Sequence, residues 1–231
     1  MLSDRRLFLK GSLGIAAASL WSSRLCADEA AGANFDPDTL FLTWQRDPTT
    51  TMTVQWVGAA GEAEGRPVWF AKHSGGLWRF EKTAARQFPL TERKMFRAEL
   101  TGLEPDTDYV FHVGLDSAPL RFRTMPTKAT NAIHFVSGGD AGIGPQVSAT
   151  NKVAAAQAPM FAVIGGDIAY ENGRAALPFL EFLRAYSRDM RDPEGRLIPL
   201  LACLGNHEVD GGYHKGRDKA PFFYACFDGP F

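Results

Sequence analysis

Apolar and polar residues alternate along residues 39–125 in short runs that turn-forming residues separate. Alternation with a period of two is typical of half-buried β-strands, and Gly, Pro, Asp and Asn between the runs mark turns. The runs predict seven strands, at residues 40–44, 51–57, 67–72, 78–83, 95–100, 109–115 and 120–124. Seven short strands joined by turns are typical of a two-layer antiparallel β-sandwich.

Residues 103–109, which read Leu-Glu-Pro-Asp-Thr-Asp-Tyr, resemble the tyrosine corner of a fibronectin type III domain. In such a corner the tyrosine hydroxyl, here that of Tyr109, returns to the backbone a few residues upstream. We therefore expect an immunoglobulin-like or fibronectin type III-like sandwich at residues 37–125. Four tryptophans are expected to fill its core: Trp44, Trp56, Trp69 and Trp78.

The pattern changes after residues 125–131, a polar segment that contains Pro126 and marks a domain boundary. Apolar runs of four to seven residues now alternate with segments of helical periodicity, which is typical of an α/β unit with a parallel sheet. Strands are predicted at residues 133–136, 160–164 and 198–204, and helices at residues 146–157 and 175–191. The inward face of the second helix is predicted from four residues at helical spacing: Leu177, Leu180, Leu183 and Tyr186.

Each of the three apolar runs leads into a short turn that carries polar side chains. The turns are Gly139–Gly142 (Gly-Asp-Ala-Gly), Gly166–Tyr170 (Gly-Asp-Ile-Ala-Tyr) and Gly205–Glu208 (Gly-Asn-His-Glu). Ligand sites of open α/β sheets collect beyond the carboxyl ends of the strands. Five side chains should therefore converge on one crevice: Asp140, Asp167, Tyr170, Asn206 and His207.

These side chains favour a pair of metal ions. Two cations about 3.5–4 Å apart can clamp the attacking and leaving oxygens of a phosphoryl transfer, and a carboxylate between them offsets their repulsion. Asp167, in the middle turn, is the natural bridge, and Tyr170 shares its face if a helix begins there. A phenolate is a hard ligand that suits Fe(III). His207 follows a ligand directly and is placed to donate a proton. Taken alone, Asp140 is better explained as a helix cap than as a metal ligand.

The three turns, in this order and spacing, resemble those of the purple acid phosphatases, a family of metallophosphoesterases. The resemblance covers residues 37–231 and implies that Asp140 and Tyr170 bind Fe(III) while Asp167 bridges. It implies that Asn206 binds Fe(II), Zn(II) or Mn(II). His207 would contact the phosphate and assist the leaving group. Large members of the family carry a fibronectin-like domain ahead of the catalytic one.

The chain departs from this family in its histidines. The family's remaining ligands are a lone His and a Gly-His-x-His in later motifs, and this sequence has neither. Its five histidines are His73, His112, His134, His207 and His214. We therefore expect residues 126–231 to form an incomplete metallophosphoesterase domain, the first half of an αββα sandwich, with four of seven ligands. Oxygen ligands alone should hold two transition metals weakly, because imidazole is the ligand that suits zinc and iron.

Composition and the first residues of the chain indicate which partners and which cell compartment to expect. The formal net charge of −1 gives no reason to expect a nucleic acid partner. Arg5-Arg6 ahead of the apolar stretch 11–21 predicts a twin-arginine signal peptide at residues 1–27, followed by a linker at residues 28–36. We expect export to the periplasm or beyond, without a stable membrane anchor. Export permits a disulfide, yet two buried thiols are favoured for Cys203 and Cys226.

The sequence thus predicts an exported, acid phosphatase-like phosphomonoesterase that acts on a phosphate ester with a dinuclear metal centre. A phosphodiesterase with the same centre is the first alternative. The second alternative is a non-catalytic binding module that retains a relic metal domain. The oligomeric state and the natural substrate stay open at this point.

Overall fold

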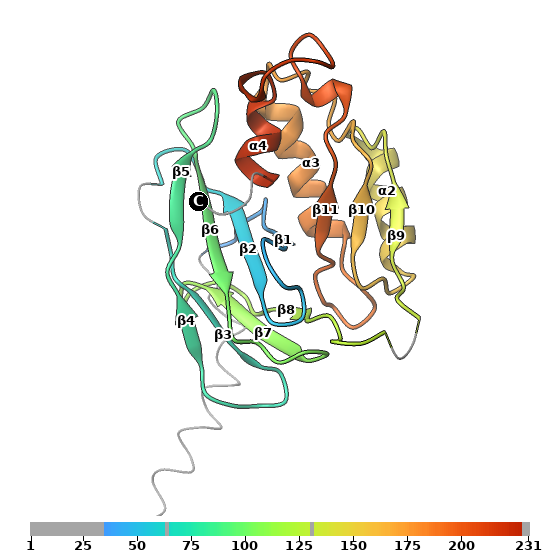
Figure 1. The fold of residues 1–231 in the computed structure, drawn as a ribbon. Helices are drawn as coiled ribbons and strands as arrows, with labels where there is room; N and C mark the ends of the chain where they lie inside the picture. Colours follow the sequence, from blue (N-terminus) through green and yellow to red (C-terminus); the bar gives the residue numbers. More distant parts are fainter. Residues whose placement is uncertain (1–34, 63–64, 130–131, 228–231) are drawn as a thin grey trace, which may run out of the picture.

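The computed structural model describes residues 35–62, 65–129 and 132–227 (Figure 1). The signal peptide expected at residues 1–27 lies outside the described residues, as does nearly all of the expected linker. Within these described ranges, every helix is too short or too polar to cross a membrane. Two parts follow one another along the chain, and they share an apolar contact.

The first part is a sandwich of two antiparallel four-stranded sheets, ordered β1-β2-β6-β5 and β4-β3-β7-β8. Its strands are β1 (Phe41–Thr43), β2 (Met52–Val57), β3 (Val68–Lys72), β4 (Arg79–Glu81), β5 (Ala84–Gln87), β6 (Lys94–Leu100), β7 (Asp108–Val113) and β8 (Leu120–Arg123). The predicted sandwich is confirmed. The strand predicted at residues 78–83 is found as β4, but β5 was not predicted: the chain crosses between the sheets after β4, so that β4 pairs with β3, whereas β5 pairs with β6.

Aromatic residues dominate the core of the sandwich. Trp56 stacks on Phe96 with ring centroids 5.4 Å apart, and both are fully buried. The tyrosine corner forms as predicted, since the Tyr109 hydroxyl accepts a hydrogen bond of 2.8 Å from the backbone N–H of Glu104. The prediction of a buried tryptophan is wrong for Trp78, which is 45% exposed and lies 5.2 Å from the ring of His112, an outward-facing residue of β7. Trp44 and Trp69 are only half-buried.

The second part is a three-stranded parallel sheet with helices, which confirms the predicted α/β class. Its strands are β9 (Val136–Gly138), β10 (Ala162–Ile164) and β11 (Leu200–Ala202), in the order β11-β10-β9. Its helices are α2 (Pro145–Ala155), α3 (Ala176–Asp189), α4 (Pro221–Phe227) and the 3-10 turns η1 (Asn206–Glu208) and η2 (Arg217–Lys219). Leu177 does not face inward as predicted, because it lies in the first turn of α3 and is 60% exposed.

The helix α4 was not predicted, because its seven residues are too few to show a helical period. Phe222, Phe223 and Cys226 of α4 are buried. Cys226 therefore behaves as predicted, but Cys203 is exposed just beyond β11, and both are free thiols.

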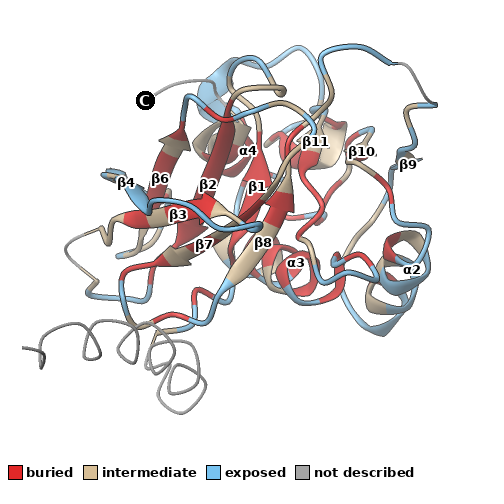
Figure 2. Cartoon of the chain, turned by 90° about the horizontal axis from the view of Figure 1, so that it is seen from below, coloured by how far each residue is buried: buried red, intermediate tan, exposed pale blue. Residues whose placement is uncertain are grey.

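The two parts meet where the sheet β1-β2-β6-β5 packs against α3 and α4 (Figure 1). Phe88 lies between Phe179 of α3 and Phe222 of α4, with centroids 6.4 and 5.8 Å away. Both faces of β2 are therefore covered, and Figure 2 shows this strand buried along its whole length. This contact anchors the α/β part, whose strand ends carry the candidate site.

Candidate metal centre

The three polar turns come together at the carboxyl ends of β9, β10 and β11. Gly138 of β9 and Ala202 of β11 both lie in register with Ile164 of β10, so the strands end level with one another. Beyond the strands, the backbone N–H groups of residues 140, 141 and 142 donate to the carbonyls of residues 166, 167 and 168 over 3.2, 3.0 and 2.9 Å. The first two turns are thus joined along their backbones.

Tyr170 reaches back to the first turn. Its hydroxyl donates a hydrogen bond of 2.8 Å to Oδ1 of Asp140. The condition for helical spacing, that a helix begin at Tyr170, is not met, because α3 begins at Ala176, close to the predicted start at residue 175, and Tyr170 has a positive φ of 58°. The left-handed backbone, rather than helical spacing, directs the phenol toward Asp140.

The third turn joins the same cluster through Asp167. Oδ1 of Asp167 accepts a hydrogen bond of 2.9 Å from the backbone N–H of His207. The rings of His207 and Tyr170 lie 4.5 Å apart, with 39° between their planes. Asn206 is half-buried at the first position of η1, beside His207. The structure therefore brings Asp140, Asp167, Tyr170 and His207 into contact and places Asn206 in the adjoining position.

Glycine is required where the second and third turns touch. Gly166 has a φ of 107°, and a Cβ on it would lie 2.7 Å from the Cα of Gly205. A Cβ on Gly205 would lie 2.3 Å from the backbone nitrogen of Asp167. Contacts this short exclude any side chain, so the glycine that opens each turn lets the aspartate and histidine backbones approach.

Glu208 holds these turns together, a role that the sequence did not reveal. Its side chain is fully buried, and its carboxylate accepts hydrogen bonds from the backbone N–H groups of Gly205, Asp167 and Ile168 over 2.7, 2.8 and 2.7 Å. Hydrogen bonds to a buried carboxylate are among the stronger ones in proteins. The one signal in the sequence is the three-residue spacing from Gly205 to Glu208, which is that of a capping box.

The backbone around the centre is strained at four non-glycine positions. Asp140, Asp167, Tyr170 and Asn172 all have φ between 50° and 58°. The left-handed region costs a non-glycine residue about 1 kcal/mol or more, somewhat less for Asp and Asn. Residues in this conformation gather at functional sites, where the surrounding structure holds them. Here Glu208 holds one of the four, Asp167, through its backbone N–H.

Negative charge is concentrated in the cluster. The hydrogen bond to Asp140 raises the pKa of Tyr170 above its ordinary value, and the charges of Asp140, Asp167 and Glu208 raise it further. Burial raises the pKa of Glu171 to about 8, so this carboxyl is mainly neutral at pH 7 and adds little to the negative charge; neither of its oxygens has a hydrogen-bond partner among the described residues. An acidic cluster of this kind attracts a cation.

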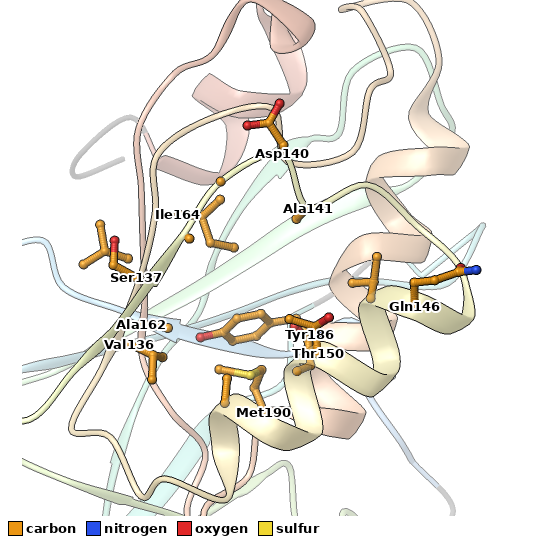
Figure 3. A pocket seen from close by; sticks show the side chains of 16 residues that line it. Val136, Ser137, Asp140, Ala141, Gln146, Thr150, Ala162, Ile164, Tyr186 and Met190 are labelled. Carbon is orange, nitrogen blue, oxygen red and sulfur yellow. The ribbon is translucent and has the colours of Figure 1, made fainter.

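A cavity of about 430 Å³ lies beside the centre, between α2 and the strands β9 and β10. Asp140 is at one end of its lining, apart from Tyr186 and Met190 (Figure 3). Its walls are mainly aliphatic, from residues such as Val147, Ala154 and Ile164. The cavity is therefore a packing gap beneath the helix; Asp140 borders it, whereas Asp167, Tyr170 and Asn206 are not part of its lining.

The residues of the cluster fit a hard cation. Asp140 and Tyr170 present two oxygens 2.8 Å apart, and a metal ion that replaced the phenolic proton would be bound by both. Across the described ranges, no group of three or more His, Cys, Asp or Glu side chains lies close enough to hold an ion. The candidate centre thus depends on the phenol of Tyr170 and the amide of Asn206 as well as on the two aspartates.

Comparison with known proteins supports the prediction made for the first part of the chain, the sandwich. Residues 37–130 match the family model of the purple acid phosphatase N-terminal domain. Two curated proteins from Mycobacterium tuberculosis, the uncharacterized proteins Rv2577 (strain H37Rv) and MT2654 (strain CDC 1551), are each 27% identical to the chain over 82% of its length. The chain spans about 40% of the length of these relatives.

Proposed function

We propose that the protein is a metal-dependent phosphoric ester hydrolase, an acid phosphatase-like phosphomonoesterase with a dinuclear centre. The observation that carries the proposal is the contact between Tyr170 and Asp140, which joins two turns that lie 30 residues apart in the sequence. The match of residues 37–130 to the domain that precedes purple acid phosphatase catalytic domains supports it. Because a signal peptide is predicted at residues 1–27, we also propose that the protein is exported.

Each residue of the cluster has a role in this proposal. Asp140 and Tyr170 would hold Fe(III), Asn206 would hold Fe(II), Zn(II) or Mn(II), and Asp167 would lie between the two ions. When bound, the ions supply positive charge that stabilises the developing charge on the phosphoryl oxygens. Asp167 also fixes the third turn, because its carboxylate accepts the backbone N–H of His207. His207 gives a proton to the leaving oxygen as the ester bond breaks.

Hydrolysis of an aryl phosphate by the protein isolated from its native host tests the proposal. Asp167→Asn removes the bridging carboxylate, and we expect turnover to fall by at least about 10³-fold because metal ions contribute several kcal/mol to such reactions. Asp116→Asn is the matched control, since Asp116 pairs with Arg66 in the sandwich, far from the cluster in the fold. Equal turnover by the two variants would refute the assignment of Asp167.

Comparing rates on monoesters and diesters in the same preparations separates the two hydrolase candidates. A higher kcat/KM on diesters would replace the phosphomonoesterase proposal by the phosphodiesterase one. A folded protein that hydrolyses neither class with any supplied Fe, Zn or Mn would favour the binding module.

A further inference from the structure

Asn172 contacts His207 at two points. Its backbone N–H donates a hydrogen bond of 2.8 Å to the His207 carbonyl. Its side-chain Oδ1 lies 2.8 Å from Nδ1 of the His207 ring. Asn172 lies in the loop that follows Tyr170, so the second turn and its continuation hold both the backbone and the ring of His207.

The orientation of the Asn172 amide is fixed by a second hydrogen bond. Its Nδ2 donates to the carbonyl of Tyr170 over 3.0 Å. Turning the amide over would bring Oδ1 against this carbonyl oxygen, and two acceptors would then face each other. The oxygen of the amide therefore faces the ring. Because an amide oxygen can only accept, Nδ1 of His207 must carry the proton.

We propose that Asn172 is a positioning residue that keeps the proton of the neutral His207 ring on Nδ1 and leaves Nε2 for the substrate. The Tyr170 ring, 4.5 Å from the His207 ring, limits its rotation from one side. The contribution to catalysis rests on the proposed function, whereas the position of the proton does not. During turnover, Nε2 first takes up a proton from solvent, which gives the imidazolium; this proton then passes to the leaving oxygen as the P–O ester bond breaks, and Nδ1 keeps its own proton, hydrogen-bonded to Oδ1 of Asn172.

The backbone at Asn172 allows a clean pair of variants. Its φ of 53° lies in the left-handed region, which glycine adopts without strain and which Asp tolerates better than most residues. Asn172→Gly therefore removes the side chain and leaves the turn intact. Asn172→Asp keeps an oxygen acceptor for Nδ1 but loses the donor to the Tyr170 carbonyl.

Nitrogen-15 NMR of the histidine rings tests the position of the proton without any need for activity. His207→Gln identifies the His207 signals among those of the five histidines. We expect the neutral ring to carry its proton on Nδ1 in the wild type and in Asn172→Asp, and to populate the Nε2-protonated form in Asn172→Gly. A wild-type ring protonated on Nε2, or an identical ring spectrum in Asn172→Gly, would overturn the inference.

Kinetics on an aryl phosphate tests the consequence. We expect kcat of Asn172→Gly to fall roughly threefold to tenfold, as for the loss of one hydrogen bond, with KM within about twofold and with most of kcat restored in Asn172→Asp. An unchanged kcat would overturn the positioning role. If the wild type hydrolyses no phosphate ester while the NMR result holds, the proposed function fails and the assignment of the proton to Nδ1 stands.

Discussion

The two parts of the molecule are stabilised in different ways. The sandwich has strands of up to seven residues and a core of large, fully buried side chains such as Trp56, Phe96 and Phe111. The strands of the α/β part have three residues each, and the turns beyond them depend on one buried carboxylate. Stability is thus spread over many apolar contacts in the sandwich, whereas the geometry of the candidate site depends on a few polar ones.

This difference predicts that the largest effect of a single substitution falls at Glu208. Glu208→Ala leaves three backbone N–H groups without their acceptor, two of them in the tightly packed second turn. We expect the free energy of unfolding of the α/β part to fall by about 3–5 kcal/mol, because buried donors lose charge-assisted bonds. Chemical denaturation, monitored by amide hydrogen exchange, measures this loss for each part of the molecule. The amides of the sandwich are expected to stay protected from exchange.

The matched control is Glu181→Ala, which removes an exposed glutamate from α3. A surface substitution of this kind changes the free energy of unfolding by at most about 0.5 kcal/mol. Equal effects of the two substitutions would show that Glu208 does not hold the turns.

The next largest effect is expected at the contact between the two parts. Arg97 of β6 is 5% exposed, and its guanidinium donates to Oε1 of Gln55 over 2.8 Å and to the carbonyl of Cys226 over 3.2 Å. Burial lowers the pKa of Arg97 to about 10, so the group stays charged at neutral pH. Arg97→Met removes both the donor to Gln55 of β2 and the donor to the α4 carbonyl, and we expect the free energy of unfolding to fall by about 2–3 kcal/mol, measured by urea unfolding.

Arg46→Met provides the comparison for Arg97, because the Arg46 side chain is 61% exposed in its ion pair with Glu99. Exposed ion pairs contribute about 0–1 kcal/mol. If Arg97→Met costs no more than Arg46→Met, the polar contact does not fasten the two parts together.

A smaller effect is expected within the sandwich itself. Tyr109→Phe deletes the hydroxyl that accepts the Glu104 N–H and leaves the ring stacked on Phe122. We expect a loss of about 1 kcal/mol, the net value of one hydrogen bond, by thermal unfolding. Tyr213→Phe is the control: Tyr213 is 61% exposed, and loss of its hydroxyl should leave the unfolding temperature unchanged. A drop for Tyr109→Phe as large as that for Glu208→Ala would contradict the distributed stability of the sandwich.

The smallest effect should appear on acidification. Burial alone would raise the pKa of Asp108, but the hydrogen bond and charge of Arg196, together with Arg123, outweigh burial and lower it. A carboxyl whose pKa is lowered by folding adds stability above its unfolded pKa of about 3.9, and this stability is lost as the pH falls through the folded value. Asp108→Asn should therefore cost under about 1 kcal/mol at pH 7 and flatten the stability profile below pH ~4. Parallel acid profiles for the two proteins would refute this.

The sequence predicted those features that depend on local patterns. Alternation located the strands of the sandwich, and the tyrosine corner placed Tyr109. Strand-ending glycines predicted that Asp140, Asp167 and His207 would meet, since the ends of parallel strands share one edge.

Features that depend on tertiary contacts were missed. The capping-box spacing of Gly205 and Glu208 does not show that Glu208 is buried under two turns, and no local signal shows that the amide of Asn172 reaches His207. Tyr170 has a left-handed backbone in place of the helical start that was the condition for its sharing a face with Asp167, because the preceding turn is held to Glu208 and to the first turn. The short β5 and α4 lacked enough residues to establish a period.

Metal content tests the central claim, that the three turns form a metal centre, most directly. Elemental analysis of the protein isolated from its native host, with Asp167→Asn and Asp116→Asn purified in parallel, measures the ions bound per molecule. We expect about two transition-metal ions in the wild type and in Asp116→Asn, at least one of them iron, and a loss of metal in Asp167→Asn. An equal metal content in Asp167→Asn and Asp116→Asn, or no metal in a folded wild-type protein, would contradict the account.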